Sequence, residues 1–200
     1  MSGILLVFFL VLTFMSANTL YFQIDLTITN TLQMLHFPLF PQLMVLVSWF
    51  GYFPQSLFLT LLILILFYTF GFRWEAATSL GIAVFDETIN VLLKTLIHRP
   101  RPAANLVNVV TSVNNYSFPS GHVMYYVAFF GFIWFLIYAL LKRSWIRTVL
   151  LFFFGILILL VGVSRVYLGA HWSSDVLGAY LLGTLILIVS IQIYIWGKKR

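Results

Sequence analysis

Long apolar stretches separated by short polar segments dominate the pattern of the chain. A helix needs about 20 mostly apolar residues to cross the roughly 30 Å hydrocarbon core of a bilayer. Six stretches meet this length if the helices tilt or if polar side chains at their ends reach the interface. They cover residues 4–22, 56–72, 74–97, 122–141, 148–163 and 174–196. The pattern therefore predicts an all-α integral membrane protein with six transmembrane helices.

Two shorter segments lie between the first and second predicted spans. Residues 24–36 and 40–49 are too short to cross a bilayer, and prolines interrupt the region around them. We expect short amphipathic or re-entrant helices at the outer face, with Trp49, Tyr52 and Phe53 at headgroup level. The sequence shows no internal repeat or second domain, so residues 1–200 are predicted to form one membrane domain. A secretory signal is an alternative for the first stretch, but no Lys or Arg precedes it.

The composition supports this interpretation and excludes several other classes of protein. Hydrophobic residues make up 62% of the chain and charged residues 8%, whereas soluble domains carry about 25% charged residues. The chain has no cysteine, which excludes disulfides, thiolate nucleophiles and thiolate metal sites. The net charge of +6 does not indicate a nucleic-acid surface, because the basic residues are sparse and lie between apolar stretches.

The distribution of the 11 Lys and Arg residues predicts an orientation in the membrane. Six spans place both termini on one face, together with most of the basic residues, and the positive-inside rule assigns this face to the cytoplasm. Lys94, Arg99, Arg101 and Arg165 fall on the opposite face, where the rule disfavours them. We therefore expect that something other than topology retains these four residues.

Ionisable residues also lie within the predicted span 74–97. Such a group costs about 3 kcal/mol on insertion scales, so each one needs a partner or a function. Glu87, Asn90 and Lys94 are spaced by three and then four residues, which places them on one helical face. We interpret Glu87 as a buried acid that acts through Asn90 to neutralise and orient Lys94, because an acid beside an anion site would repel the ligand. The sequence assigns no role to Asp86.

The end of this span carries a first basic cluster, Lys94 and Arg101. Pro100 and Pro102 end the helix and stiffen the chain, so the two cations can converge on one point. The compact ammonium of a Lys and the planar guanidinium of an Arg can together bind the oxygens of a phosphate. A juxtamembrane basic cluster that binds anionic lipid headgroups without chemistry is an equally open interpretation.

A second cluster, with the sequence FPSGH at residues 118–122, directly precedes an apolar stretch. Ser120 is expected to cap the following helix, which leaves the N–H groups of Gly121 and His122 free for an anion. His122 by itself is either an interfacial residue or an acid–base group.

A third cluster covers residues 164–175. His171 and Asp175 are four residues apart, so a helix that begins near Ala170 would bring the carboxylate against one imidazole nitrogen and make the other more basic. Arg165 would supply another guanidinium that can bind an oxygen of an anionic ligand. Zinc is an alternative ligand for two histidines and a carboxylate, but the nearby cationic side chains would repel a dication.

Taken together, the three clusters resemble the signature of the type 2 phosphatidic acid phosphatase family of membrane lipid phosphatases. That signature is a Lys, six residues, then Arg-Pro; next Pro-Ser-Gly-His; and then Ser-Arg, five residues, His, three residues, Asp. The chain matches every element in order: Lys94 and Arg101-Pro102; Pro119-Ser120-Gly121-His122; and Ser164-Arg165, His171 and Asp175. Three matched motifs are far more specific than one.

The resemblance implies a role for each matched residue. His171 would be the nucleophile that forms a phosphohistidine, with Asp175 orienting its ring. His122 would be the general acid for the leaving oxygen and then the base for the hydrolytic water. The remaining matched residues would bind the phosphate oxygens: Lys94, Arg101, Ser120, Gly121 and Arg165. No metal ion or other cofactor is implied, and His98 and Arg99 are interpreted as rim residues that attract anionic headgroups.

The implied function is hydrolysis of a lipid phosphate monoester or pyrophosphate at the outer face of the membrane. The same motifs occur in the related vanadium haloperoxidases, which are soluble. Two other functions stay open: a transporter or scramblase that uses the same cationic cleft without hydrolysis, and a silent lipid-binding subunit. The paired His171 and Asp175 favour the enzyme, because transport requires charge but no activated imidazole.

The identity of the lipid is not predicted. Phosphatidylglycerol phosphate, undecaprenyl pyrophosphate and phosphatidic acid each present an anionic phosphate on an apolar anchor. Residues 103–116 are expected to cover the entrance and to influence the choice. The small size and short loops fit a bacterial cytoplasmic membrane protein with its site on the extracellular or periplasmic side.

Overall fold

The structure is a computed structural model that describes residues 2–35, 37–111 and 115–199. These residues form nine α-helices and one π-helical turn, and none of them is in a β-strand. The elements are α1 (Ser2–Ala17), α2 (Gln23–Gln33), α3 (Phe40–Trp49), α4 (Gln55–Thr69), α5 (Arg73–Ile97), α6 (Gly121–Tyr125), η1 (Tyr126–Phe130), α7 (Gly131–Leu140), α8 (Trp145–Tyr167) and α9 (Ser173–Lys198). The predicted all-α class is confirmed.

Three helical segments are long and apolar enough to cross a membrane: Gly121–Leu140, which combines α6, η1 and α7, then α8 and α9. Helices α1, α3 and α4 are apolar but shorter. The predicted first span, 4–22, is wrong at its carboxyl end, because the helix ends at Ala17. There Asn18 Nδ2 of the side chain donates to the Phe14 carbonyl, 2.8 Å away, and satisfies an acceptor that the next helical turn would otherwise use.

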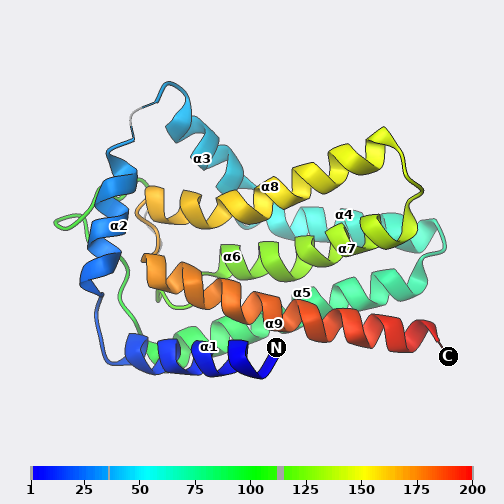
Figure 1. Cartoon of the computed structure of the whole chain (residues 1–200), viewed down its shortest axis with the longest axis horizontal. Helices are drawn as coiled ribbons and strands as arrows, with labels where there is room; N and C mark the ends of the chain where they lie inside the picture. The colour runs from blue at the N-terminus through cyan, green and yellow to red at the C-terminus, as the bar shows by residue number, and fades with distance from the viewer. Residues whose placement is uncertain (1, 36, 112–114, 200) are drawn as a thin grey trace.

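The long helices run side by side along the length of the molecule, and α2 lies across one end of this bundle (Figure 1). Helix α2 contacts both α8 and α9 at the point where the first ends and the second begins. Helix α1 packs along α9, and α3 packs on α8. The two short helices predicted between the first and second apolar stretches are therefore present as α2 and α3.

The segment from α6 to α7 lies in the centre of the bundle and supplies much of the core. Its buried side chains include Val127, Phe129 and Phe130. Phe130 packs against Phe154 of α8, with ring centroids 5.4 Å apart. Gly183 of α9 faces Val127 so closely that a Cβ there would lie 3.0 Å from Val127 Cβ. This close approach is typical of membrane bundles, where packing of small residues replaces the hydrophobic effect between helices.

Candidate functional site

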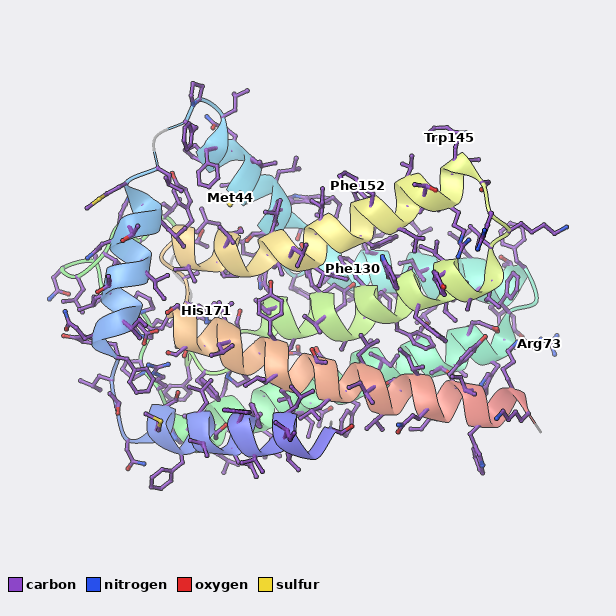
Figure 2. The ribbon with its side chains drawn as sticks, viewed as in Figure 1. Met44, Arg73, Phe130, Trp145, Phe152 and His171 are labelled. Atoms are coloured by element: carbon purple, nitrogen blue, oxygen red, sulfur yellow. The ribbon has the colours of Figure 1, made fainter. Side chains whose placement is uncertain are left out.

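The candidate site lies at the end of the bundle that α2 crosses. Figure 2 shows His171 at this end and Arg73 at the opposite end. The predicted site residues come from the last turns of α5 and α8, the first turns of α6 and α9, and the connections before α6 and α9. Residues from three separate sequence clusters therefore converge at one end of the bundle.

His171 is buried, with 2% of its surface exposed, and its Nε2 atom lies 3.1 Å from Arg101 Nη1. A guanidinium can only donate, so Nε2 must accept and the proton of the neutral ring is on Nδ1. Burial holds the pKa of His171 well below its usual range, and the positive charges of Arg101, Arg165 and Lys94 act in the same direction. The ring is thus neutral at neutral pH, with an unprotonated Nε2 beside a cation.

The pKa of His171 leads to a prediction about its titration in the phosphate-free protein. The ring of an unfolded or exposed histidine gains a proton near pH 6.5, whereas burial keeps this ring neutral as the pH falls from 8 through 6.5. We expect the ring nitrogens of His171 to keep the chemical shifts of a neutral imidazole in this range, measured by NMR of protein labelled with ¹⁵N-histidine. A titration midpoint at or above pH 6.5 would contradict the depressed pKa.

The other ring nitrogen of His171 faces Ser117 and Asp175. Ser117 Oγ lies 3.4 Å from Nδ1 and donates to Asp175 Oδ2. The direct distance from Nδ1 to Asp175 Oδ2 is 3.8 Å. The helix expected to begin near Ala170 begins at Ser173 instead, but the carboxylate still faces one imidazole nitrogen, as expected from the spacing. The Ser117 hydroxyl lies between the two groups and connects them.

A tight turn places His171 outside the helix. Gly169 has φ of +64°, a left-handed conformation that favours glycine. A Cβ at this position would also lie 2.3 Å from the backbone oxygen of Asn108. The turn lets the Ala170 carbonyl accept a 2.6 Å hydrogen bond from Arg101 Nη1. The same guanidinium group therefore contacts both the turn and the ring that the turn presents.

Arg101 is held from a second side by the backbone and side-chain oxygens of Asn115, 2.8 and 3.1 Å from its Nε. Burial, together with the charge of Arg165, lowers the pKa of Arg101 to about 10. The group is still protonated at pH 7. Arg101 is therefore a fixed cation at the reactive nitrogen of His171.

Arg165, at the end of α8, is buried and points toward the segment that follows α3. Its Nη1 donates to Tyr52 Oη at 2.8 Å and to Ser48 Oγ at 3.2 Å. The Tyr52 ring packs edge-on against His122, with centroids 4.6 Å apart. The adjacent Gly51 permits this approach, since a Cβ there would lie 2.6 Å from His122 Cδ2. Tyr52 therefore connects Arg165 and His122, and its expected position at headgroup level stays a prediction.

The start of α6 differs from the expected capped helix. Ser120 precedes the first helical residue, but its side chain makes no capping hydrogen bond. Asn90 of α5 supports this corner by donating to the Pro119 carbonyl at 3.2 Å. Three buried polar atoms of the predicted site residues have no hydrogen-bond partner within the described residues: Ser120 Oγ, His122 Nε2 and Arg165 Nε. Buried polar atoms are rarely left unpaired, so these three are available for a polar ligand.

Comparison with known proteins identifies the family. The PAP2 superfamily profile matches residues 74–199. This chain belongs to the PAP2 superfamily. Phosphatidylglycerophosphatase B of Bacillus subtilis strain 168 is 32% identical over 186 residues, which cover 91% of this chain and 89% of that protein. An undecaprenyl-diphosphatase of Sulfolobus acidocaldarius is 36% identical over 86 residues, or 43% of this chain and 37% of that protein.

Solved structures support the same assignment. The crystal structure of a transmembrane PAP2-type phosphatidylglycerolphosphate phosphatase from Bacillus subtilis matches with a TM-score of 0.81 and 27% identity, over 96% of this chain and 94% of that chain. The structure of Aquifex aeolicus LpxE matches in fold, with a TM-score of 0.68 and 21% identity over 86% and 96% of the two chains. The resemblance inferred from the three motifs is confirmed, and this PAP2 protein is an integral membrane protein.

Two interpretations of polar residues in this PAP2 protein are wrong. Glu87 is exposed on the surface of α5, and Asn90 is instead buried and bonded to Pro119. Glu87 therefore does not act on Lys94 through Asn90, but its negative charge still acts on Lys94 electrostatically. Arg99, expected at the rim, has 1% of its surface exposed and pairs with two carboxylates, whereas His98 is exposed and packs against Tyr116.

The connection 103–116 of this PAP2 protein is tied to the outer helices where it is described. Gln33 of α2 donates to the Asn108 carbonyl at 2.7 Å and accepts from the Asn108 amide at 3.0 Å. Val110 donates to the Leu168 carbonyl at 3.0 Å. Residues 112–114 lie outside the described residues. That this connection covers the entrance and influences the choice of lipid stays a prediction.

Sequence reasoning missed Ser117, Tyr52 and Asp25. Ser117 had a weak local signal, because it stands three residues before the matched Ser120. Tyr52 and Asp25 precede the family match and have no motif around them. Their contacts with the site depend on how α2 and α3 fold back over the bundle.

Proposed function

We propose that this chain is a membrane enzyme that hydrolyses a lipid phosphate monoester or pyrophosphate through a phosphohistidine on His171, without a metal ion. One observation carries the proposal: the buried, unprotonated Nε2 of His171 lies 3.1 Å from the Arg101 guanidinium. A nucleophile and a cation for the phosphate oxygens are thus side by side. Membership of the PAP2 superfamily and the similarity to named lipid phosphatases support the same function.

In the first step, the substrate phosphate binds among the cations, and His171 Nε2 attacks phosphorus in line. The bond from phosphorus to the lipid oxygen breaks, and His122 donates a proton to that oxygen. The phosphate-binding groups are Lys94, Arg101, Arg165, Ser120 and the amide of Gly121. Because Ser120 Oγ and Arg165 Nε have no hydrogen-bond partner among the described residues, they can donate to the phosphate without breaking a bond seen there.

In the second step, a water molecule attacks the phosphohistidine while His122, now neutral, accepts its proton. The bond between nitrogen and phosphorus breaks, inorganic phosphate leaves, and His171 returns to its neutral form. The imidazole gains positive charge while it carries the phosphoryl group. Asp175 stabilises this charge through its contact with Ser117 and the Nδ1 side of the ring.

The proposed reaction needs no metal because three cationic side chains perform the neutralising role. Lys94, Arg101 and Arg165 all act electrostatically on His171. Such cationic side chains repel a metal ion, which requires ligands such as carboxylate oxygens. We expect the purified protein to release phosphate in EDTA. Candidate substrates are phosphatidylglycerol phosphate, undecaprenyl pyrophosphate and phosphatidic acid.

The test is inorganic phosphate release by the detergent-purified protein from each of these lipids, with and without EDTA. Release from at least one lipid in EDTA is the expected result, and the ranking of rates identifies the preferred headgroup. Strict dependence on a divalent ion contradicts the metal-free reaction. No release from any lipid, together with lipid flipping in vesicles, would instead support a transporter or scramblase.

We also propose one membrane domain, residues 1–200, with six spans: α1, α4, α5, Gly121–Leu140, α8 and α9. The packing of α1 along α9 supports a single unit, because it joins the amino-terminal segment to the region that matches the family. The site then faces the extracellular or periplasmic side. Arg73 lies at the opposite end of the bundle, as the positive-inside rule requires for the cytoplasmic end (Figure 2).

The orientation leads to a prediction that the cysteine-free sequence makes simple to test. Ala104 is exposed in the connection at the site, and Lys142 is exposed between α7 and α8. In intact cells, a membrane-impermeant maleimide should label Ala104→Cys but not Lys142→Cys, and both should react after permeabilisation. The reverse pattern in intact cells would place the site in the cytoplasm.

A further inference from the structure

A buried ionic network lies behind the candidate nucleophile, and none of the proposed catalytic steps uses all of it. Arg99 Nη1 lies 2.5 Å from Asp175 Oδ1, and Arg99 Nη2 lies 3.0 Å from Asp25 Oδ2. The side chains of all three residues are fully buried. One guanidinium therefore joins the carboxylate beside His171 to a second carboxylate from α2.

Asp25 is bound as completely as a carboxylate can be. Its Oδ1 accepts from Ser173 Oγ at 2.7 Å and from the Ser174 amide at 2.8 Å. Its Oδ2 accepts from Ser174 Oγ at 2.8 Å and from the Phe22 amide at 3.0 Å, besides Arg99. Asp25 of α2 thus caps the amino terminus of α9 from a distant part of the chain. The capped residue Ser173 lies two residues before Asp175.

Asp175 and Asp25 occupy equivalent positions on their helices. Each carboxylate accepts a hydrogen bond from the backbone amide three residues earlier, that of Trp172 at 2.9 Å and that of Phe22 at 3.0 Å. The remaining oxygen of Asp175 is held by Arg99, and Ser174 Oγ also accepts from Arg99 at 2.7 Å. Neither carboxylate can rotate without losing several buried hydrogen bonds.

The charges of the network sum to one negative charge. Asp175 and Arg99 alone would form a neutral pair, and such a pair would have little electrostatic effect on the neighbouring imidazole. Asp25 offsets the charge of Arg99. A buried negative charge without a full partner is costly, and His171 is the neighbouring group that becomes positive when it carries a phosphoryl group.

We infer that Arg99 and Asp25 are positioning residues for His171: Arg99 fixes Asp175, and Asp25 offsets Arg99 so that the network stays negative toward the ring. This inference rests on the proposed phosphohistidine reaction. It also explains why α2, which lies outside the family match, covers this end of the bundle. The contribution of Asp25 is made through Arg99 and Asp175, without contact with the reacting atoms.

Three variants separate charge from simple capping. Asp25→Asn keeps an acceptor oxygen but makes the network neutral, whereas the double variant Asp25→Asn with Arg99→Gln restores one negative charge. Ser173→Ala removes one hydrogen bond to Asp25 and changes no charge, so it is the matched control. We measure kcat and KM for phosphate release from the lipid that the wild type hydrolyses fastest, with thermal unfolding to check folding.

We expect Asp25→Asn to lower kcat on the order of tenfold with little change in KM, because the charge acts on the transition state. The double variant should recover to within about threefold of wild type, because Arg99→Gln keeps an N–H donor for Asp175 while the network again carries one negative charge. Ser173→Ala should stay close to wild type. Wild-type kcat in Asp25→Asn, or a folded double variant no faster than Asp25→Asn, overturns the inference.

The inference can also be tested if Asp25→Asn does not fold or if the wild type is inactive. If Asp25→Asn does not fold, the double variant decides alone, and a folded double variant more than about tenfold slower than wild type overturns the charge argument. If the wild type itself releases no phosphate, the proposed function fails, and the network is tested by NMR of the His171 ring nitrogens. Their shifts should change in Asp25→Asn and return in the double variant, and unchanged shifts in Asp25→Asn overturn the inference.

Discussion

His171→Ala is expected to abolish phosphate release and to lower kcat by at least about 10⁴-fold, because the reaction then has no nucleophile. The nucleophilic atom is Nε2, which lies 3.1 Å from Arg101 Nη1. Phosphate release from the lipid that the wild type prefers is the primary measurement. Rapid quenching with ³²P-labelled lipid should also trap acid-labile phosphate on the wild-type protein and none on the variant.

Lys142→Ala, at the opposite end of the bundle, is the control for expression and purification, and it should keep wild-type activity. Thermal unfolding checks that the His171→Ala protein is folded, since a buried ring has been removed and a cavity is left. A folded His171→Ala protein that still forms labelled phosphoenzyme would assign the nucleophile to another residue.

His122→Ala is expected to lower kcat for a lipid phosphate by roughly 10²- to 10⁴-fold, because the leaving alkoxide then receives no proton. The loss should depend on the leaving group. With a water-soluble aryl phosphate whose phenol has a low pKa, departure needs no general acid, so the first step should be nearly unaffected. The second step still lacks its base, and we therefore expect labelled phosphohistidine to accumulate.

The measurement compares lipid and aryl phosphates in single-turnover and steady-state experiments with wild type and His122→Ala. Accumulation of phosphoenzyme with the aryl substrate supports both roles of His122, since only turnover of the intermediate is blocked. Equal losses with both substrates, and no accumulation, would limit His122 to positioning. Its Nε2, which has no hydrogen-bond partner among the described residues, and its contact with Tyr52 make the catalytic role the expected one.

The three motif clusters were predictable because each depends on short-range spacing. Lys94 with Arg101, the residues before α6, and His171 with Asp175 occupy neighbouring positions around single helix ends, where prolines and glycine set the local path of the chain. Their convergence into one site followed from the family resemblance. Details within each cluster were less predictable: α9 begins three residues after the expected position, and Ser117 contacts both His171 and Asp175.

Charged residues were harder to interpret from the sequence, because helical spacing shows which residues share a face and not what that face contacts. Glu87 shares a face with Asn90, but the Glu87 side chain is exposed, whereas Asn90 is buried and donates to the Pro119 carbonyl. Arg99 stands in a run of polar residues that is typical of a membrane rim. Its burial depends on Asp25, 74 residues earlier in the chain, and no local pattern indicates that partner.

The sequence by itself determined that this protein is helical, belongs in a membrane and carries the chemistry of a phosphoryl-transfer site. Each of these follows from residue type and spacing, since apolar length and motif order are local properties of a chain. Only the tertiary structure decided which polar groups meet behind that site. Buried charges must find partners wherever the packed helices bring them, so Asp25, Ser117 and Tyr52 joined the site through the folding of α2, α3 and the connection before α6 over the end of the bundle.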